Sequence, residues 1–348
     1  MCICIYELFG AYIRGCEKTI IYALGGVIYT VIYSITNIVM LSFLKLGVKG
    51  YIDSSIIACV LTSIYYFIFA NLKESFSFTG RKNFYLHREM LKYSIPLIPN
   101  NISWWISNSS DKFLIKYYVS IDETGLYSIA YRIPNLLNAI ALVFINAWQL
   151  ATVENLNKRG SCQFYNIVYN TYFRYMVLLS TFIISLGKIL SKMLFLKSFY
   201  DAWIFIPSLT LAAFFCNLAT FAGGILTAYK STNIIFKSTL AGAVLNILLN
   251  ILIIPFYGGI GAAWTTCISY GIVLGIRIIF LLRNMNIFLC SKKHCCIMFI
   301  LILQAISYSR LSYFNVLFPF LISGIYMRTI TTDIQNGIKY LKRLFFTR

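Results

Sequence analysis

Long apolar runs recur along the whole chain and are separated by short polar breaks. Each run is close to the roughly 20 residues that a helix needs to cross a bilayer, and none alternates like a transmembrane barrel strand. The pattern therefore predicts an all-α, polytopic membrane protein with about ten transmembrane helices. The predicted spans are 19–44, 50–72, 93–118, 125–150, 165–187, 203–228, 234–256, 262–282, 294–308 and 311–328.

Composition and charge support this prediction. The 348 residues are 59% hydrophobic and 12% charged, with a mean hydropathy of +0.75, whereas soluble domains are about 25% charged. The net charge of +19 would suggest a nucleic-acid partner in a soluble protein. Here most Lys and Arg residues lie at the ends of spans, where they set the orientation in the membrane. We therefore expect no nucleic-acid partner.

The basic residues also predict which loops face the cytoplasm. The longest polar interruption, residues 73–92, is rich in Lys and Arg, so the positive-inside rule places it in the cytoplasm. Counting spans from this loop places the C-terminus there as well. Residues 329–348 have apolar positions at helical spacing with basic residues between them, which is typical of a helix that lies on the inner leaflet.

Cysteine usage suggests no special chemistry. The ten Cys residues are scattered, no Cys-x-x-Cys pair occurs, and only two His residues are present. We expect free thiols rather than a metal site or a disulfide framework, and we expect no cofactor.

An internal repeat divides the chain. The stretch "LGVKGYIDSSIIACVL" (46–61) aligns with "YGGIGAAWTTCISYGI" (257–272), which pairs Gly47 with Gly258. Parallel repeats of this kind build two-lobed transporters. The offset between the copies predicts that roughly 120 residues of the first lobe, about four spans, are absent from this chain, through either a wrong start codon or a truncated gene. The expected parts are 1–72 as a remnant of the first lobe, 73–92 as a cytoplasmic linker, 93–283 as a second lobe of six spans, 284–328 as two additional spans, and 329–348 as a basic amphipathic tail.

Residues 93–137 carry a family resemblance. They combine a Ser-Ile-Pro-x-x-Pro helix start, two Trp residues, the motif "SNSSDK" and the motif "GLYS" that begins the next helix. This stretch resembles the start of the second lobe in polysaccharide and O-antigen flippases of the Wzx type, within the multidrug/oligosaccharidyl-lipid/polysaccharide exporter superfamily. "AYIRGCEKT" (11–19) and "LGVKGY" (46–51) are similar to the family's fifth and sixth helices, and its first four helices have no counterpart. The resemblance implies a two-lobed flippase-like architecture with an incomplete first lobe.

The resemblance also implies a function. Such a protein is a transporter, not an enzyme, and moves undecaprenyl-pyrophosphate-linked oligosaccharide across the bacterial cytoplasmic membrane for the synthesis of O-antigen (part of lipopolysaccharide), capsule or other surface polysaccharide. Its partners would be this lipid-linked glycan, the bilayer, and a polysaccharide polymerase with chain-length proteins. The alternatives are a multidrug or small-molecule exporter of the same superfamily, a membrane polysaccharide polymerase or ligase, and an inactive fragment. The short predicted external loops, which contain no His, argue against a polymerase.

Polar side chains follow one face of each of three successive predicted spans. A charge at the middle of a membrane costs about 2.5–3.5 kcal/mol on insertion scales, so such a face is expected to line a cavity or to meet a partner. The candidate substrate-binding residues are Asn100, Ser107, Asp111 and Lys112 in the first span, Arg132, Asn135, Asn138, Asn146 and Gln149 in the second, and Asn170 and Arg174 in the third.

The charged candidates have different expected roles. Arg132 and Arg174 are expected to contact the pyrophosphate, because guanidinium groups bind phosphate oxygens in a bidentate manner. Asp111 and Lys112 could instead form ion pairs that lock an outer gate, and Asp111 could also bind a proton or a sodium ion that couples transport. Arg174 could extend to the inner headgroups, as we expect of Arg277.

Overall fold

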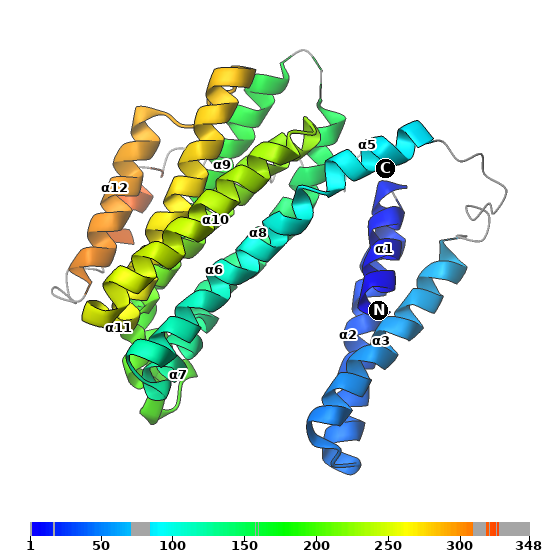
Figure 1. The fold of residues 1–348 in the computed structure, drawn as a ribbon, viewed down its shortest axis with the longest axis horizontal. Helices are drawn as coiled ribbons and strands as arrows, with labels where there is room; N and C mark the ends of the chain where they lie inside the picture. Colours follow the sequence, from blue (N-terminus) through cyan, green and yellow to red (C-terminus); the bar gives the residue numbers. More distant parts are fainter. Residues whose placement is uncertain are drawn as a thin grey trace, which may run out of the picture. The chain divides into compact units, whose positions relative to one another are not determined.

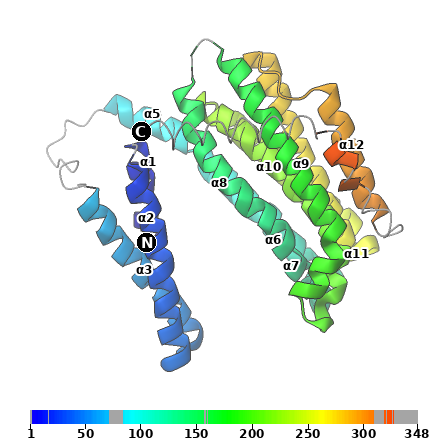
Figure 2. The ribbon, with the colours of Figure 1, turned by 180° about the vertical axis from the view of Figure 1, so that it is seen from behind.

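The computed structural model describes residues 2–16, 18–70, 84–156, 158, 160–308, 318–319, 321–324 and 326. In this part of the chain every regular element is a helix, which confirms the predicted all-α class (Figures 1 and 2). The chain divides into two compact units, Met1–Phe84 and Tyr85–Arg348. We call them unit 1 and unit 2 and describe each by itself.

The described residues of unit 1 form three α-helices. They are α1 (Cys2–Gly15), α2 (Thr19–Ile38), which continues as one π-helical turn (Val39–Phe43), and α3 (Gly47–Phe69). Helix α3 packs against both α1 and α2. The Tyr66 ring is fully buried at this junction and stacks on Tyr6, and it approaches α2 so closely that a Cβ at Gly25 would collide with it. The missing side chain at Gly25 therefore sets the packing distance within unit 1.

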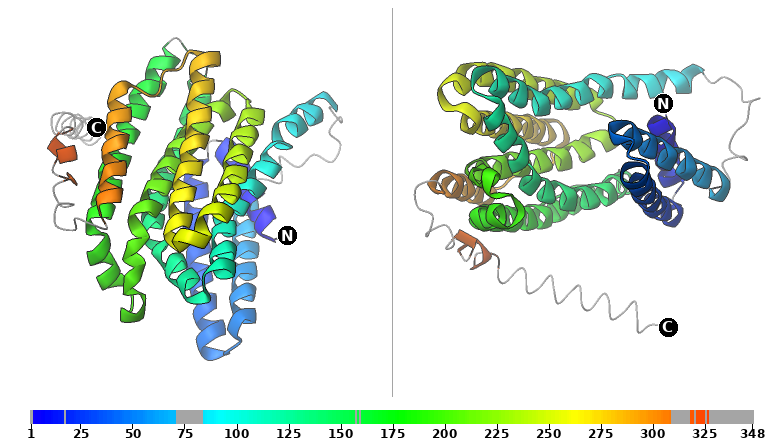
Figure 3. Two further views of the ribbon diagram at one scale, coloured as in Figure 1. Left: turned by 60° about the vertical axis from the view of Figure 1, so that its left-hand side comes forward. Right: turned by 90° about the horizontal axis from the view of Figure 1, so that it is seen from below.

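Unit 2 contains the remaining described helices. They are α5 (Phe84–Ser94), α6 (Leu97–Tyr118), α7 (Ile121–Ala130), α8 (Arg132–Glu154), α9 (Ser161–Leu194), a 3₁₀ segment (Lys197–Ile204), α10 (Ile206–Ala228), α11 (Thr232–Met285) and α12 (Lys292–Ser307). Helix α10 packs against α8, α9, α11 and α12, and α11 also packs along α6 (Figure 3). Nearly every side chain of α10 is buried, as expected for a helix that is apolar on all sides. Helix α10 is thus the core of unit 2.

Helix α11 is bent at Gly258. Its 54 residues would measure about 80 Å if straight, far more than the 30 Å or so of a bilayer core. Gly258 has φ 56° and ψ −144°, outside the helical region, and divides α11 into 232–257 and 259–285. The bend falls between the predicted spans 234–256 and 262–282. Gly47, which the internal repeat pairs with Gly258, also has a positive φ of 57°, so the two repeat copies share this backbone feature.

The observed helices agree with most of the predicted spans. Six described helical stretches are long and apolar enough to cross a membrane: 20–43, 47–69, 121–154, 161–194, 206–228 and 232–285. The stretch 121–154 joins α7 to α8, and 232–285 contains two predicted spans. Helix α6 is too polar and the 16-residue α12 too short for this criterion, although they occupy the predicted spans 93–118 and 294–308.

Parts of the predicted organisation lie outside the described residues. These parts are 73–83 of the linker, most of the span 311–328, and the basic tail 329–348. The rest of the linker is not an open loop, because residues from Phe84 onward form α5.

Arg277 is buried, so the prediction that it extends to the headgroups is wrong. Only 2% of this residue is exposed, and its guanidinium donates hydrogen bonds to three neutral acceptors. Nε donates to Ser238 Oγ at 3.0 Å, Nη1 to the Ala219 carbonyl at 2.7 Å, and Nη2 to Thr239 Oγ1 at 2.9 Å. These bonds connect α10 to both halves of α11. Gly223 permits the approach, because a Cβ there would lie 2.9 Å from Nη1.

Candidate functional site

A polar groove of about 720 Å³ opens in unit 2, mainly between α8 and α10. Among its described lining residues the charged side chains are Lys112 and Arg132, and none is a carboxylate. The groove is therefore positively charged and able to form hydrogen bonds. Its polar lining residues are Asn108, Lys112, Ser128, Tyr131, Arg132, Asn135, Asn138, Asn217, Thr220 and Tyr270.

Helix α8 supplies the largest share of these side chains. Arg132, Asn135 and Asn138 follow one another at steps of three residues, which places them on one helix face. Asn138 Nδ2 donates to Asn135 Oδ1 at 3.1 Å, and Asn217 Nδ2 of α10 donates to Asn138 Oδ1 at 2.8 Å. A chain of amides therefore crosses from α8 to α10 and holds the two walls of the groove together.

Lys112 brings the second positive charge from α6. Its side chain is exposed, and Nζ lies 5.7 Å from the centre of the Tyr131 ring, within the range of a cation–π contact. Tyr131 directly precedes α8, so this contact connects the lysine to the arginine-bearing helix. The two cations thus line the same groove from different helices.

Asp111, one residue earlier, has a different environment. It is fully buried and accepts hydrogen bonds from three neutral side chains. Tyr127 OH and Thr266 Oγ1 donate to its Oδ2 at 2.8 Å and 2.7 Å, and Asn250 Nδ2 donates to Oδ1 at 2.6 Å. Successive helical residues are turned by 100°, which explains why Lys112 faces the groove and Asp111 faces α11. The structure gives Asp111 neutral partners where an ion pair was one of the predicted alternatives.

Further side chains from α6 and α11 complete the surroundings of Asp111. Asn246 accepts from Ser110 Oγ at 3.1 Å and from Asn250 Nδ2 at 3.2 Å, and Thr265 Oγ1 donates to Asn250 Oδ1. We call this set the Asp111 centre; it comprises Ser110, Asp111, Tyr127, Asn246, Asn250, Thr265 and Thr266. It joins α6, α7 and both halves of α11.

The chemistry of the Asp111 centre suits a small cation or a proton. A carboxylate buried among neutral groups is costly unless it is protonated or its charge is compensated. The centre offers carboxylate, amide and hydroxyl oxygens, which are the ligands that hard cations prefer. In the part of the chain that the structure describes, no cluster of three or more His, Cys, Asp or Glu residues could hold a transition metal.

Helix α7 supports this centre from the loop between α6 and α8. Ser120 caps α7 by accepting from the Glu123 backbone N–H at 3.1 Å. The Glu123 carboxylate in turn accepts from the Gly259 N–H at 2.6 Å, at the start of the second half of α11. One helical turn later, Tyr127 reaches Asp111. A single short helix thus binds both the bend of α11 and the buried carboxylate.

Comparison with known proteins relates this geometry to a family. A family model described as "polysaccharide biosynthesis protein" matches residues 20–155, which include the stretch 93–137. The uncharacterized membrane protein MJ1375 of Methanocaldococcus jannaschii is 24% identical over 275 residues. The matched region is 74% of this chain and 62% of that relative, so the chain spans less than two thirds of the relative's length.

Solved structures match the fold over most of the chain. The lipid II flippase MurJ in an inward closed conformation matches with a TM-score of 0.64 and 17% identity, over 96% of this chain and 72% of its own. A MATE protein in complex with MaL6 matches with a TM-score of 0.70 and 13% identity. This match covers 82% of this chain and 67% of the MATE protein. The chain has the all-helical fold of the MurJ and MATE transporters. The polysaccharide-biosynthesis family match and the shared fold agree with the resemblance to Wzx-type flippases inferred from residues 93–137.

Within this MurJ-like and MATE-like fold, only some of the predicted site residues come together. Lys112, Arg132, Asn135 and Asn138 line the groove. The other predicted residues are not among its described lining: Asn100, Ser107 and Asp111 are buried on α6, Asn146 and Gln149 lie further along α8, and Asn170 and Arg174 lie on α9.

Arg174 is separate from the groove. It is 8% exposed, and its Cζ lies 5.8 Å from the centre of the Tyr326 ring. No described residue of α9 lines the groove. Helical spacing placed Arg174 on a polar face of its own helix but could not show which helix covers that face.

The sequence prediction missed several groove residues, of which Asn217 and Tyr270 are examples. Asn217 is the single amide in the apolar helix α10. A lone amide in an apolar span could have been recognised in the sequence as a candidate lining residue. Tyr270 of α11 donates to Asn108 Oδ1 at 2.8 Å, a contact between residues 162 positions apart that no local pattern reveals.

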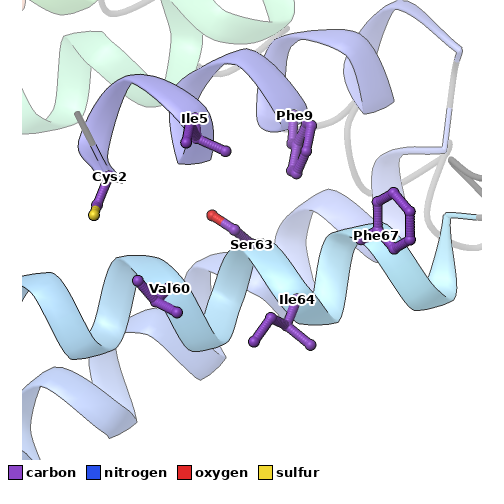
Figure 4. Close-up of a pocket in the computed structure, with 7 residues that line it drawn as sticks. All are labelled: Cys2, Ile5, Phe9, Val60, Ser63, Ile64 and Phe67. Atoms are coloured by element: carbon purple, nitrogen blue, oxygen red, sulfur yellow. The ribbon is translucent and has the colours of Figure 1, made fainter. Parts of the chain in front are cut away.

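A second pocket, of about 280 Å³, lies in unit 1 between α1 and α3 (Figure 4). Its lining is almost entirely apolar, and the one hydroxyl, Ser63 Oγ, donates to the Cys59 carbonyl at 2.7 Å within α3. This pocket is a gap between packed helices and has no candidate chemistry.

Proposed function

We propose that this chain works in a flippase that moves an anionic, lipid-linked oligosaccharide across a membrane. The observation that carries the proposal is the groove, whose charged lining residues are Lys112 and Arg132 and whose other polar residues are mostly amides and hydroxyls. Such a surface complements a ligand that joins phosphate to sugar. The match to polysaccharide biosynthesis proteins and the fold of a lipid II flippase support the same substrate class.

In this proposal the two ends of the substrate contact different residues. The pyrophosphate contacts Arg132 and Lys112, because the guanidinium binds phosphate oxygens in pairs and the ammonium adds a second charge. Sugar hydroxyls exchange hydrogen bonds with Asn135, Asn138 and Asn217. The substrate class is undecaprenyl-pyrophosphate-linked repeat units, and the membrane is the bacterial cytoplasmic membrane with the C-terminus in the cytoplasm.

The Asp111 centre is the candidate for energy coupling. Binding of a proton or a sodium ion neutralises the buried carboxylate, and the centre touches both halves of α11 and the loop helix α7. Occupancy of the centre therefore affects the angle between these helices. We propose that this change drives the alternation between inward and outward access.

Export of cationic drugs is a second candidate, because MATE multidrug transporters share the fold. A cationic substrate would favour a groove lined by carboxylates, whereas the charged residues here are Lys112 and Arg132. The charge of the groove therefore favours the anionic substrate.

Replacing Arg132 by Ala tests the proposed function. We expect export of the surface polysaccharide to fall about tenfold or more, since a hydrogen-bonded contact to a charged group contributes about 1.5–3 kcal/mol. The variant is made at the native locus, and surface polysaccharide is measured at matched membrane abundance. Arg283→Ala is the matched control, because Arg283 is an exposed arginine in the last turn of α11 and does not line the groove. Undiminished export by Arg132→Ala would remove the proposed phosphate contact.

A further inference from the structure

Two thiols are in contact at the connection between α11 and α12. Cys290 Sγ and Cys295 Sγ lie 3.7 Å apart, which is van der Waals contact. The ten cysteines are scattered along the sequence, but the side chains of this pair are adjacent in space. Cys296, the next residue along the chain, is also exposed yet is not part of the contact.

A well-defined helix start holds the two sulfur atoms together. Ser291 is the N-cap of α12, and its Oγ accepts from the His294 N–H at 3.4 Å. The His294 ring accepts in return from the Ser291 N–H at 3.1 Å. This reciprocal capping box fixes the turn between the residue before the cap, Cys290, and the first turn of the helix, which contains Cys295.

The two cysteines have different environments. Cys295 is exposed and follows Lys292 and Lys293, whereas Cys290 is half-buried. Burial raises the pKa of the Cys290 thiol to about 12, and the contact with Cys295 adds to the shift. Cys295 is therefore the thiol that a peroxide reaches more easily, and the thiolate is the reactive form of a cysteine.

Both thiols also lie at an apolar cleft of about 430 Å³ between α11 and α12. Leu274 and Ile278 of α11 and Met298 and Phe299 of α12 line the same cleft. A covalent bond between the thiols would tie the segment that follows α11 to α12 at this cleft.

We propose that Cys290 and Cys295 form a site of reversible oxidation by peroxides. The Cys295 thiolate attacks one peroxide oxygen, the O–O bond breaks, and the products are a Cys295 sulfenic acid and hydroxide, which is protonated to water. The Cys290 sulfur then attacks the sulfenic sulfur, and the thiol proton leaves with the hydroxyl group as a second water. Two thiols are oxidised to one disulfide, one peroxide is reduced to two waters, and reduction by a thiol restores the pair.

The geometry requires a small movement, from 3.7 Å to the 2.05 Å or so of a disulfide bond. The positive-inside rule puts this segment on the cytoplasmic face, where disulfides in mesophiles are usually transient and redox-sensing. The proposal does not depend on the transported substrate.

Peptide mapping of the full-length protein in native membranes tests the proposal. The membranes are treated with hydrogen peroxide, free thiols are alkylated, and the purified protein is digested with trypsin, which cuts after Lys292 and Lys293 between the two cysteines. We expect a pair of peptides joined through Cys290 and Cys295 that separates on reduction, together with the loss of alkylation at these two positions alone. Full alkylation of both cysteines after peroxide treatment would overturn the proposal.

Three single substitutions test the order of events. Cys296→Ser is the matched control and is expected to form the bridge as well as the unmodified protein. Cys290→Ser is expected to stop at the sulfenic acid, detected as a dimedone adduct on Cys295. Cys295→Ser is expected to give neither a bridge nor an adduct on Cys290. A bridge that involves Cys296, or a dimedone adduct on Cys290 in Cys295→Ser, would contradict the assigned roles.

Discussion

Replacing Asp111 by Ala is expected to abolish export and to destabilise unit 2 by several kcal/mol. The substitution leaves Tyr127, Thr266 and Asn250 without their common acceptor in a fully buried position. A buried donor that loses its partner costs about 1–3 kcal/mol. Thermal unfolding in detergent measures the destabilisation, and surface polysaccharide measures export.

Asp122→Ala is the matched control for this substitution. Asp122 is an exposed carboxylate in the first turn of α7, in the same region of unit 2. Its removal is expected to change the unfolding midpoint little, because surface substitutions usually change stability by less than about 0.5 kcal/mol. Equal midpoints for the two variants would show that the Asp111 centre does not stabilise the fold.

The conservative variant Asp111→Asn separates stability from coupling. It keeps the size of the side chain and one acceptor oxygen, so the protein is expected to fold, but it cannot bind a proton reversibly and carries no charge for sodium. Any dependence of export on sodium or on pH should disappear in this variant. If that dependence persists, Asp111 is not the coupling group.

Gly258→Ala is expected to give the second large effect. Gly258 has a positive φ and a ψ of −144°, a conformation that costs a residue with a Cβ about 1–3 kcal/mol. The added Cβ would also lie 2.5 Å from Glu123 Oε1, the atom that accepts the Gly259 N–H. We therefore expect a lower thermal unfolding midpoint and weaker contact between α7 and α11.

Gly271→Ala is the control, because a Cβ at this position of the same helix meets no atom within 4 Å. It is expected to leave stability unchanged or slightly raised, since Ala favours a helix over Gly. A double substitution with Glu123→Ala distinguishes the two causes of the Gly258 effect. If the clash dominates, Glu123→Ala relieves much of the loss, and if backbone strain dominates, the two losses add. A Gly258→Ala midpoint equal to that of Gly271→Ala would contradict both explanations.

Much of the fold could be predicted from the sequence, because membrane spans depend on local composition. The length of the apolar runs predicted the helices, and the break between the predicted spans 234–256 and 262–282 coincides with the bend that Gly258 makes in α11. The helix ends were less predictable, as α9 shows: it runs from Ser161 to Leu194, well beyond the predicted 165–187. Its extension depends on packing against neighbours rather than on its own polarity.

The site was only partly predictable, because periodicity shows which residues share a face but not what covers that face. Ser103, Ser107 and Asp111 do share one face of α6, and all three are buried. Their face packs against α11, whose Asn250 lies 139 residues away from Asp111. The error on Arg277 has the same cause, since its acceptors belong to α10 and to the other half of α11.

The burial of Arg277 has an electrical consequence. An arginine keeps its positive charge in a protein, and this one is fixed between α10 and α11 within a predicted membrane span. One elementary charge that crosses the whole membrane potential changes its energy by about 2.3 kcal/mol per 100 mV. Because the guanidinium is bound to both helices, a tilt that moves them along the membrane normal would carry the charge with it. An inside-negative voltage would therefore favour the conformation that brings Arg277 closer to the cytoplasm. The membrane voltage would thus shift the equilibrium between the conformations of unit 2.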